Sequence, residues 1–391
     1  MRILLLTSSF HPLTGGAESY ARTLAAGLAS EGHQVVVATD GHDVAGLPLS
    51  ERVDGYEVLR PRAYSAEVDR KDKVRWRQMQ YAVLSELSGL LGEQRFDVVH
   101  SNSHECLVLG SIVALEQGAA LVASLHEQNP QSEPFGLGRS LLSYRTLPVD
   151  LFLAASDFYA QRCTASGVPR EAVRKVYHGV TVPEPRPDAW TGLRTRLGAT
   201  ADTPLIVCPA RIYTRKDQLT LVEAMARVRV RVPTARLLLA GRVSDQLYAQ
   251  RLAQLTGKLG LTDAVHIIED FANTDMPDVL GAADLVALPS LEEGLGLAAI
   301  EAMALGRPVV GTDVVGLREV LTDRHDALVV PPRSPDRLGA ALTRLLLEPA
   351  LARELGEEAR RTVQKRFSAS SMVLETIRCY REAVDRRAER P

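Results

Sequence analysis

The sequence has few cysteines and no long apolar run, and these two absences exclude several classes of protein. Its four cysteines lie far apart with no C-x-x-C pair, which argues against a zinc site or a disulfide framework and suits a reducing compartment. No run approaches the ~18 apolar residues that a membrane-spanning helix needs. The apolar run Ile3–Leu6 is too short for a signal peptide. We therefore expect a soluble, cytoplasmic protein.

The chain also lacks an excess of charge of either sign. Its formal net charge is −2, with 46% hydrophobic and 24% charged residues, which is typical of an ordinary globular protein. Because no domain-wide basic surface exists, nucleic-acid binding is not expected. A chain of 391 residues is too long for one core of typical size, so we expect two domains.

The first half of the sequence alternates short apolar runs with amphipathic helices, the pattern of a parallel α/β sheet. One helix is expected at Glu18–Glu31, ending at Gly32. Strands are expected at Ile3–Leu6, Val35–Ala38, Tyr56–Leu59, Val98–His100, Leu121–Ser124 and Leu151–Ala154. The segment Thr181–Pro204 is dense in proline and is interpreted as an interdomain linker.

The alternation restarts after this segment. Strands and helices are expected at Leu205–Cys208, Gln218–Val230, Arg236–Ala240, Gln246–Leu259, Val265–Ile268, Met276–Gly281, Val309–Gly311, Ala327–Val330 and Pro335–Leu346. The pattern predicts two doubly wound domains, residues 1–183 and 184–367, with ligand bound at the carboxyl ends of the strands in the cleft between them. A last helix, within residues 368–391, carries the apolar stripe Val373, Ile377, Tyr380 and Val384.

One strand–loop–helix segment carries most of the functional information. An apolar strand, Asp284–Pro289, leads into the loop Ser290–Leu297, and the helix that follows stops at Gly306. Such a turn leaves backbone N–H groups uncovered at a helix N-terminus, where an anion such as a diphosphate is favoured. Carboxylates beside a phosphate repel it unless they accept hydrogen bonds from sugar hydroxyls. Glu293 and Glu301 therefore point to a nucleotide sugar.

Two further loops carry candidate phosphate ligands. Gly15-Gly16-Ala17-Glu18 follows the first strand, where paired glycines allow close approach of a ligand to the backbone. The spacing is not G-x-G-x-x-G, but Asp40 keeps a NAD(P)-dependent oxidoreductase open as an outside alternative. Arg211 and Lys216 follow the first strand of the second half; they suit a departing diphosphate, or are simply solvated.

These motifs together resemble those of the retaining family-4 glycosyltransferases with the GT-B fold. Residues 293–310 match E-G-x-G-L-x-x-x-E-A-M-A-x-G-x-P-V-V, and the first loop matches G-G-x-E. Residues 210–217 match G-R-x-x-x-x-K-G, except that Ala210 and Asp217 replace the two glycines. The resemblance spans nearly the whole chain and implies two Rossmann-like domains, with the last helix crossing back to the first.

The resemblance also implies a role for each site residue. His126, at a strand end of the first domain, would lie near the reactive carbon of the sugar. Arg211, Lys216 and the amides at Gly294–Gly296 would stabilise the leaving diphosphate, Glu293 would hold the donor sugar, and Glu301 the ribose. The predicted catalytic residues are His126, Arg211, Lys216 and Glu293; the donor-binding residues are Gly16, Gly294, Leu295, Gly296, Leu297 and Glu301; weaker acceptor candidates are Glu18 and Ser156. Ser156 is equally well explained as a helix N-cap.

The implied reaction moves a hexose from a nucleotide diphosphate sugar, most readily UDP- or GDP-linked, to a hydroxyl of a small-molecule, lipid-linked or glycan acceptor. No Asp-x-Asp motif is present, so we expect no metal and no other cofactor. A nucleotide-sugar epimerase or hydrolase of the same fold, and a non-catalytic sugar-binding protein, remain alternatives. The basic segment Arg60–Arg77 has three interpretations: a solvated face, a site for a phosphorylated acceptor, or a peripheral contact with the inner face of the membrane.

Overall fold

The structure is a computed structural model that describes residues 1–12, 16–39, 46–63, 73–125, 144–182, 184, 186–269 and 276–389, without the side chains of 73–77. The chain divides into two compact units. Unit 1 comprises residues 1–179 and 369–391, and unit 2 comprises residues 180–368. Each unit is described by itself. No helix in the described ranges is long and apolar enough to cross a membrane.

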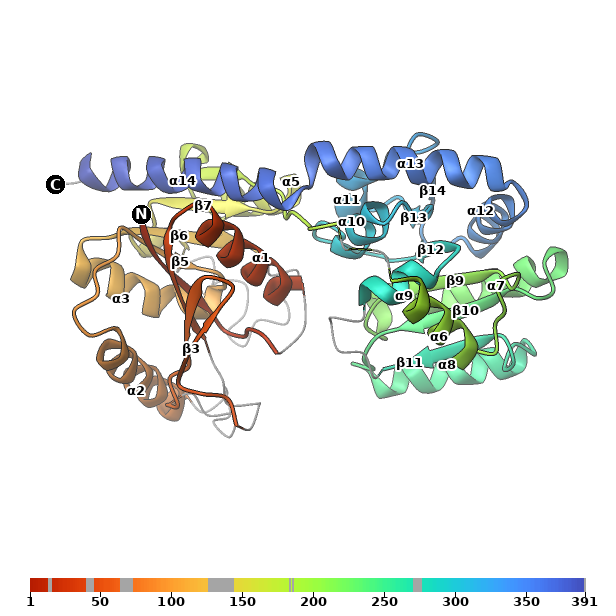
Figure 1. Cartoon of the computed structure of the whole chain (residues 1–391), viewed down its shortest axis with the longest axis horizontal. Coiled ribbons are helices and arrows are strands. Elements are labelled where there is room, and N and C mark those ends of the chain that lie inside the picture. Colours follow the sequence, from red (N-terminus) through yellow and green to blue (C-terminus); the bar gives the residue numbers. More distant parts are fainter. Residues whose placement is uncertain are drawn as a thin grey trace. The chain divides into compact units, whose positions relative to one another are not determined.

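Unit 1 is built around one sheet flanked by helices (Figure 1). Its elements are β1 (Arg2–Thr7), α1 (Gly16–Ser30), β2 (Gln34–Thr39), β3 (Ser50–Val53), β4 (Tyr56–Leu59), α2 (Lys73–Leu91), β5 (Val98–Ser101), η1 (His104–Cys106), α3 (Leu107–Gln117), β6 (Ala120–Leu125), β7 (Leu151–Ala154), α5 (Asp157–Ala165), η3 (Arg170–Ala172), β8 (Val173–Lys175) and α14 (Ala369–Glu389).

The sheet of unit 1 has the strand order β3-β4-β2-β1-β5-β6-β7-β8 and is parallel except for the β3–β4 hairpin. Successive residues of β1 face opposite layers, as a strand requires. Ile3 and Leu5 pack in the core that α1 and α14 cover, whereas Leu6 faces α2 and α3. Both faces of the sheet are thereby buried, which explains why its central strands are continuous apolar runs.

The last helix, α14, belongs to unit 1 and packs on α1 and β6. Val373, Ile377 and Tyr380 are buried, which confirms the apolar stripe predicted for this helix. Close packing against α1 depends on Gly27, because a Cβ there would lie 2.3 Å from Cγ2 of Val373. The C-terminal segment therefore completes the core of the N-terminal unit.

Unit 2 is a second, smaller α/β unit (Figure 1). Its elements are α6 (Pro187–Arg196), β9 (Leu205–Pro209), η4 (Thr214–Lys216), α7 (Gln218–Arg231), β10 (Arg236–Ala240), α8 (Gln246–Lys258), β11 (Val265–Ile268), α9 (Met276–Ala282), β12 (Leu285–Leu288), α10 (Leu297–Ala304), β13 (Val309–Thr312), α11 (Val315–Val320), β14 (Leu328–Val330), α12 (Pro335–Leu347) and α13 (Pro349–Arg366). Its sheet is wholly parallel, in the order β11-β10-β9-β12-β13-β14.

The strand order of each sheet reverses at one point. In unit 1 the reversal falls between β1 and β5, and in unit 2 it falls between β9 and β12. At such a switch point the loops that leave the two neighbouring strands diverge and open a crevice at the carboxyl edge of the sheet. The fold therefore marks the loops after β1 and β5, and those after β9 and β12, as the places for ligands.

The interpretation of Thr181–Pro204 as a linker is wrong for its central part. Helix α6 begins at Pro187 and packs on α9, with Trp190 closing over Gly281. Proline is tolerated at the first position of a helix, because the N–H that it lacks would have had no intrahelical partner there. The density of proline in this segment therefore obscured a helix start.

Candidate functional site

The predicted phosphate ligands of unit 2 lie on the two loops at its switch point. Lys216 ends η4 in the loop after β9, and Glu293 lies in the loop after β12. The Lys216 ammonium donates to Oε1 of Glu293 across these loops. Their side chains are 16% and 6% exposed, so the ion pair is largely withdrawn from water. The structure thus brings together two residues that lie 77 positions apart.

Glu293 is held by a second donor that the sequence analysis did not identify. The Ser290 hydroxyl donates to the same oxygen, Oε1, over 2.7 Å, and Ser290 is itself buried. Within the described part of the chain Oε2 of Glu293 has no hydrogen-bond partner. The carboxylate is therefore fixed through one oxygen while the other stays available to accept. A serine three residues before Glu293 was the only signal in the sequence.

The loop that carries Glu293 is supported from behind. The Thr312 hydroxyl donates to the Ser290 carbonyl over 2.5 Å. Gly316 in α11 lies against this backbone, and a Cβ there would stand 2.4 Å from the Glu293 carbonyl oxygen. Only glycine at this position lets α11 approach the loop this closely.

Helix α10 begins at this loop. Gly294, Leu295 and Gly296 precede it, and Gly296 is its N-cap with φ +90°, a conformation that favours glycine. The first N–H groups of a helix have no intrahelical partner, and the helix dipole places partial positive charge there. Leu297 starts a helix of eight residues whose N-terminus lies in the same loop as Glu293.

Glu301 lies one turn into α10 and is only partly exposed. Burial raises the pKa of its carboxyl group to about 7, from an ordinary 4.5. No hydrogen bond or ion pair to this carboxylate exists within the described ranges. A carboxylate kept without a partner in a protein interior is poised to accept from a ligand hydroxyl.

Arg211 is exposed, as a group that contacts an incoming ligand would be. Its guanidinium lies 5.1 Å from the centre of the Tyr213 ring, a cation–π distance. Asp217, which replaces a glycine of the family pattern, adopts the left-handed conformation with φ +48°. The loop therefore keeps a backbone shape that glycine favours, and Thr220 donates to the Asp217 carboxylate over 2.7 Å.

The switch point of unit 1 has different chemistry. Glu18 of α1 accepts from the Ser9 hydroxyl, and Asn102, after β5, is fully buried. Gly16 is the first residue of α1 and is exposed. Gly15, Asp40 and His126 lie outside the described residues, so the role predicted for His126 stays a prediction. Glu18 and Gly16 do lie together at the end of α1 that faces the loop after β1.

Ser156 is the N-cap of α5, which confirms the structural interpretation of this residue. Its side-chain oxygen accepts from the Tyr159 N–H over 3.4 Å, and its side chain is fully buried. Contact with an acceptor therefore needs a rearrangement of the cap, and the acceptor role stays a prediction.

Arg60 is not part of an exposed basic surface, contrary to the interpretation of Arg60–Arg77 as a solvated face. It is 4% exposed and its guanidinium forms an ion pair with Glu51 over 2.5 Å. Residues 64–72 and the side chains of 73–77 lie outside what the structure describes, so the remaining interpretations of this basic segment stay predictions.

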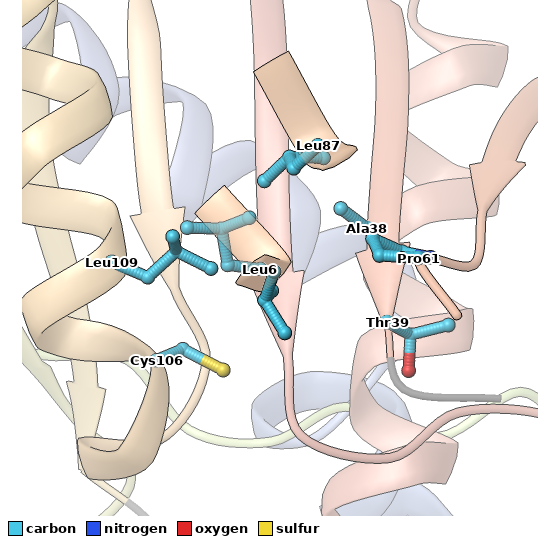
Figure 2. Close-up of a pocket in the computed structure, with 8 residues that line it drawn as sticks. Leu6, Ala38, Thr39, Pro61, Leu87, Cys106 and Leu109 are labelled. Atoms are coloured by element: carbon cyan, nitrogen blue, oxygen red, sulfur yellow. The ribbon is translucent and has the colours of Figure 1, made fainter. Parts of the chain in front are cut away.

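A small hollow, too narrow to admit a water molecule, lies in unit 1 between α2, α3 and the central strands (Figure 2). Leu6, Ala38, Leu87 and Leu109 contribute its walls, and its polar atoms are the Thr39 hydroxyl and the Cys106 thiol. A diphosphate needs charged or N–H donors, so this hollow is no phosphate site. Among the described residues no cluster of three or more His, Cys, Asp or Glu could hold a metal ion. The absence of a metal requirement stays a prediction.

Comparison with protein families identifies both halves of the chain. Residues 191–362 match the family described as Glycosyl transferases group 1, and residues 14–182 match Glycosyltransferase Family 4. The first match contains all of the unit 2 loops described above.

Two curated relatives align along almost the whole chain. The D-inositol 3-phosphate glycosyltransferase of Kineococcus radiotolerans is 30% identical over 100% of this chain and 97% of that protein. The GDP-mannose-dependent alpha-(1-6)-phosphatidylinositol monomannoside mannosyltransferase of Mycobacterium tuberculosis is 28% identical, with 93% of each chain covered.

A solved structure shows the same fold. Sucrose-phosphate synthase from Thermosynechococcus elongatus superposes with a TM-score of 0.81 at 24% identity, covering 97% of this chain and 98% of that one. The two parallel sheets with interleaved helices are those of the GT-B fold, as the motifs implied.

Proposed function

The chain belongs to the family-4 glycosyltransferases, and from this premise we propose that it transfers a hexose with retention from a UDP- or GDP-sugar to an acceptor hydroxyl. The observation that carries the proposal is the convergence of Lys216 and Glu293 on the switch point of unit 2, beside the N-terminus of α10. This arrangement offers cations, backbone N–H groups at a helix N-terminus and carboxylates within one pair of loops, which is what a nucleotide sugar needs.

The positive groups act on the leaving diphosphate. As the bond between the sugar and the phosphate breaks, negative charge develops on the nucleotide, and preorganised donors aimed at it lower the barrier. Arg211 binds from the exposed side of the loop after β9, and Lys216 from its buried side. The amides at the start of α10 complete the set. The departing phosphate then accepts the proton of the attacking hydroxyl.

The carboxylates act on the sugars of the donor. Glu293, fixed through Oε1, accepts from hydroxyls of the transferred sugar with its second oxygen. Glu301 accepts from the ribose, and its lack of a protein partner gives it the capacity to do so. In the free enzyme the accepting oxygens have no ligand hydroxyl to bind, which costs free energy. Binding of the donor removes this cost.

The relatives suggest the class of acceptor. Their names specify an inositol phosphate and a phosphatidylinositol mannoside, and the second name specifies GDP-mannose. We propose a polyol or glycolipid hydroxyl as the acceptor and GDP-mannose as the first donor to test, with UDP-sugars as the second arm. The enzyme would act in the cytoplasm, with a peripheral contact to the inner face of the membrane if the acceptor is a lipid.

The test is a thermal-shift panel of UDP-, GDP-, ADP- and TDP-sugars, first without metal and then with magnesium. A ligand that binds only the native state stabilises it by about 2.7 kcal/mol at a hundred times its dissociation constant. We expect one nucleotide to raise the melting temperature without metal. Transfer from that donor to D-inositol 3-phosphate and to phosphatidylinositol monomannoside follows, with NMR of the anomeric proton to establish retention.

Two outcomes would contradict the proposal. No shift with any nucleotide sugar would remove the donor assignment. Release of free sugar at the same rate with and without every acceptor would instead identify a hydrolase of the same fold.

A further inference from the structure

A second pair of contacts ties the two loops of unit 2 together beside the Lys216–Glu293 pair. The Leu291 N–H donates to the Arg215 carbonyl over 2.8 Å. The Arg215 guanidinium lies 3.7 Å from Oε1 of Glu292. Residues 215 and 216 thus meet residues 291 to 293 through one backbone contact and two side-chain contacts.

The Arg215 side chain is only 21% exposed, and Tyr213 accounts for part of its cover. The guanidinium donates to the Tyr213 hydroxyl over 3.0 Å and lies 5.5 Å from the centre of its ring. Arg211 approaches the same ring. Tyr213 is therefore in contact with both arginines, the exposed Arg211 and the more covered Arg215.

Arg215 is an addition to the pattern that Arg211 and Lys216 match, and the sequence alone left open whether it faces solvent or phosphate. A group facing solvent would be largely exposed, whereas Arg215 is covered and is engaged by both Tyr213 and Glu292. The contacts of Arg215 run instead along and between the loops.

We propose that Arg215 is a positioning residue that, with Tyr213 and Glu292, holds the loops after β9 and β12 at the separation a donor diphosphate requires. The inference rests on the proposed function. Its consequence is that Glu292, a carboxylate beside a phosphate site, strengthens nucleotide binding by fixing Arg215. Coulomb repulsion alone would have it weaken binding.

The test is therefore whether removing the Glu292 carboxylate weakens or strengthens nucleotide binding. Calorimetric titrations with GDP and with UDP are made on the wild type and on Glu292→Ala and Arg215→Ala. If Glu292 acted only through its charge, Glu292→Ala would bind the nucleotide more tightly. We expect it to bind about threefold more weakly, as the loss of a partly exposed ion pair that positions the loop would produce. Arg215→Ala should bind at least as weakly, because it also loses the hydrogen bond to Tyr213.

Three further variants separate positioning from general loss of charge. The double variant Arg215→Ala/Glu292→Ala should bind no more weakly than Arg215→Ala, because the two residues act through one contact. Arg215→Lys should recover part of the affinity. Arg227→Ala, which breaks the exposed Arg227–Asp336 pair elsewhere in unit 2, should bind like the wild type. Thermal unfolding of each variant establishes that it is folded.

Tighter or unchanged binding by Glu292→Ala, or additive losses in the double variant, would overturn the inference. These results are distinct from failure of the proposed function, in which the wild type itself binds neither nucleotide and transfers no sugar.

Discussion

The two switch points of this molecule share a topology and differ in chemistry. In unit 2 the loops after β9 and β12 carry Arg211, Arg215, Lys216, Glu292 and Glu293, and opposite charges meet across the crevice. In unit 1 the loops after β1 and β5 carry a Ser9–Glu18 hydrogen bond and a buried Asn102.

Unit 1 has a more elaborate polar network in its strands and helices rather than in its switch loops. His100 of β5 contacts the Tyr380 hydroxyl at 2.6 Å and the Ser124 hydroxyl at 2.7 Å, and Tyr20 lies 3.4 Å from Ser124. All four residues are buried, and they join α1, two strands and α14. The comparison teaches that one topology can gather charged groups on its switch loops or polar groups where helices pack on the sheet.

The largest effect is expected from removing a charged residue of the unit 2 switch loops. Lys216→Ala and Glu293→Ala should each lower the transfer rate by about 10²- to 10³-fold, because preorganised charge at a departing anion is lost. Steady-state kinetics with the identified donor measures this. Lys258→Ala, at an exposed lysine of the same unit, serves as the control and should be fully active.

Each single variant also leaves a buried charge without its partner, which lowers stability. The double variant Lys216→Met/Glu293→Gln should therefore recover the melting temperature while staying inactive. An active double variant would show that the pair is structural and would contradict the site.

The next largest effect is expected from breaking the buried polar network of unit 1. Tyr380→Phe removes the hydroxyl that meets His100 and so breaks a buried hydrogen bond, which should lower the free energy of unfolding by about 0.5–1.5 kcal/mol. Nucleotide affinity should not change, because the network lies in the other unit. Urea denaturation and calorimetry measure the two quantities. Tyr81→Phe is the matched control, since Tyr81 is 74% exposed.

A change of nucleotide affinity in Tyr380→Phe, at conditions where the variant is folded, would show that the two units are not separate in the way this comparison requires.

A smaller expected effect is the pH dependence of nucleotide affinity, which tests the role of Glu301. Glu301, with its pKa raised to about 7, is neutral below that pH and ionised above it. Because an ionised carboxylate accepts more strongly from ribose hydroxyls, nucleotide affinity should rise severalfold between about pH 6 and about pH 8. Glu301→Gln should show a flat profile over this range. An identical rise in the variant would remove Glu301 from the donor site.

Glu301 also affects the free energy of unfolding, which should fall as the pH rises, whereas the nucleotide affinity should rise. Between about pH 4.5 and about pH 7 the folded state keeps a proton on Glu301 that the unfolded state has released. The stabilisation that this proton gives the folded state is therefore fully present below about pH 4.5. The contribution is lost as the pH rises through about 7. Glu301→Gln should therefore lose less stability than the wild type on going from acid to neutral pH.

The smallest effect concerns Ser156. Ser156→Ala should cost about 1 kcal/mol of stability, as the loss of a helix cap does, and leave the acceptor KM unchanged. Ser156→Thr keeps a capping hydroxyl without adding charge and should retain most of the stability. If Ser156→Thr is stable but raises the acceptor KM, the residue contacts the acceptor after all.

The sequence allowed the fold class to be predicted because strands buried on both faces are continuous apolar runs, as in β1 and β12. It did not reveal β3 and β8, which lie at the edges of the sheet and alternate or mix polar residues. Helix α6 was missed because Pro187, read as a breaker, starts the helix.

For the donor site, the motif spacing identified Lys216 and Glu293, which the structure then brought into contact. The parts that hold them could not be predicted. Ser290 and Tyr213 contact residues near them in sequence, and Gly316 contacts the Glu293 backbone. Which of these side chains and backbones meet depends on the packing around the loops, which the spacing of residues does not specify. The burial that raises the pKa of Glu301 was likewise invisible, because it depends on the packing around α10.

The measurement that tests the central claim most directly is hydrogen exchange by mass spectrometry, with and without saturating GDP or UDP. If the donor diphosphate binds at the switch point of unit 2, the nucleotide should protect the amides of residues 211–216 and 290–301. Protection confined to unit 1, or none with either nucleotide, would contradict the account.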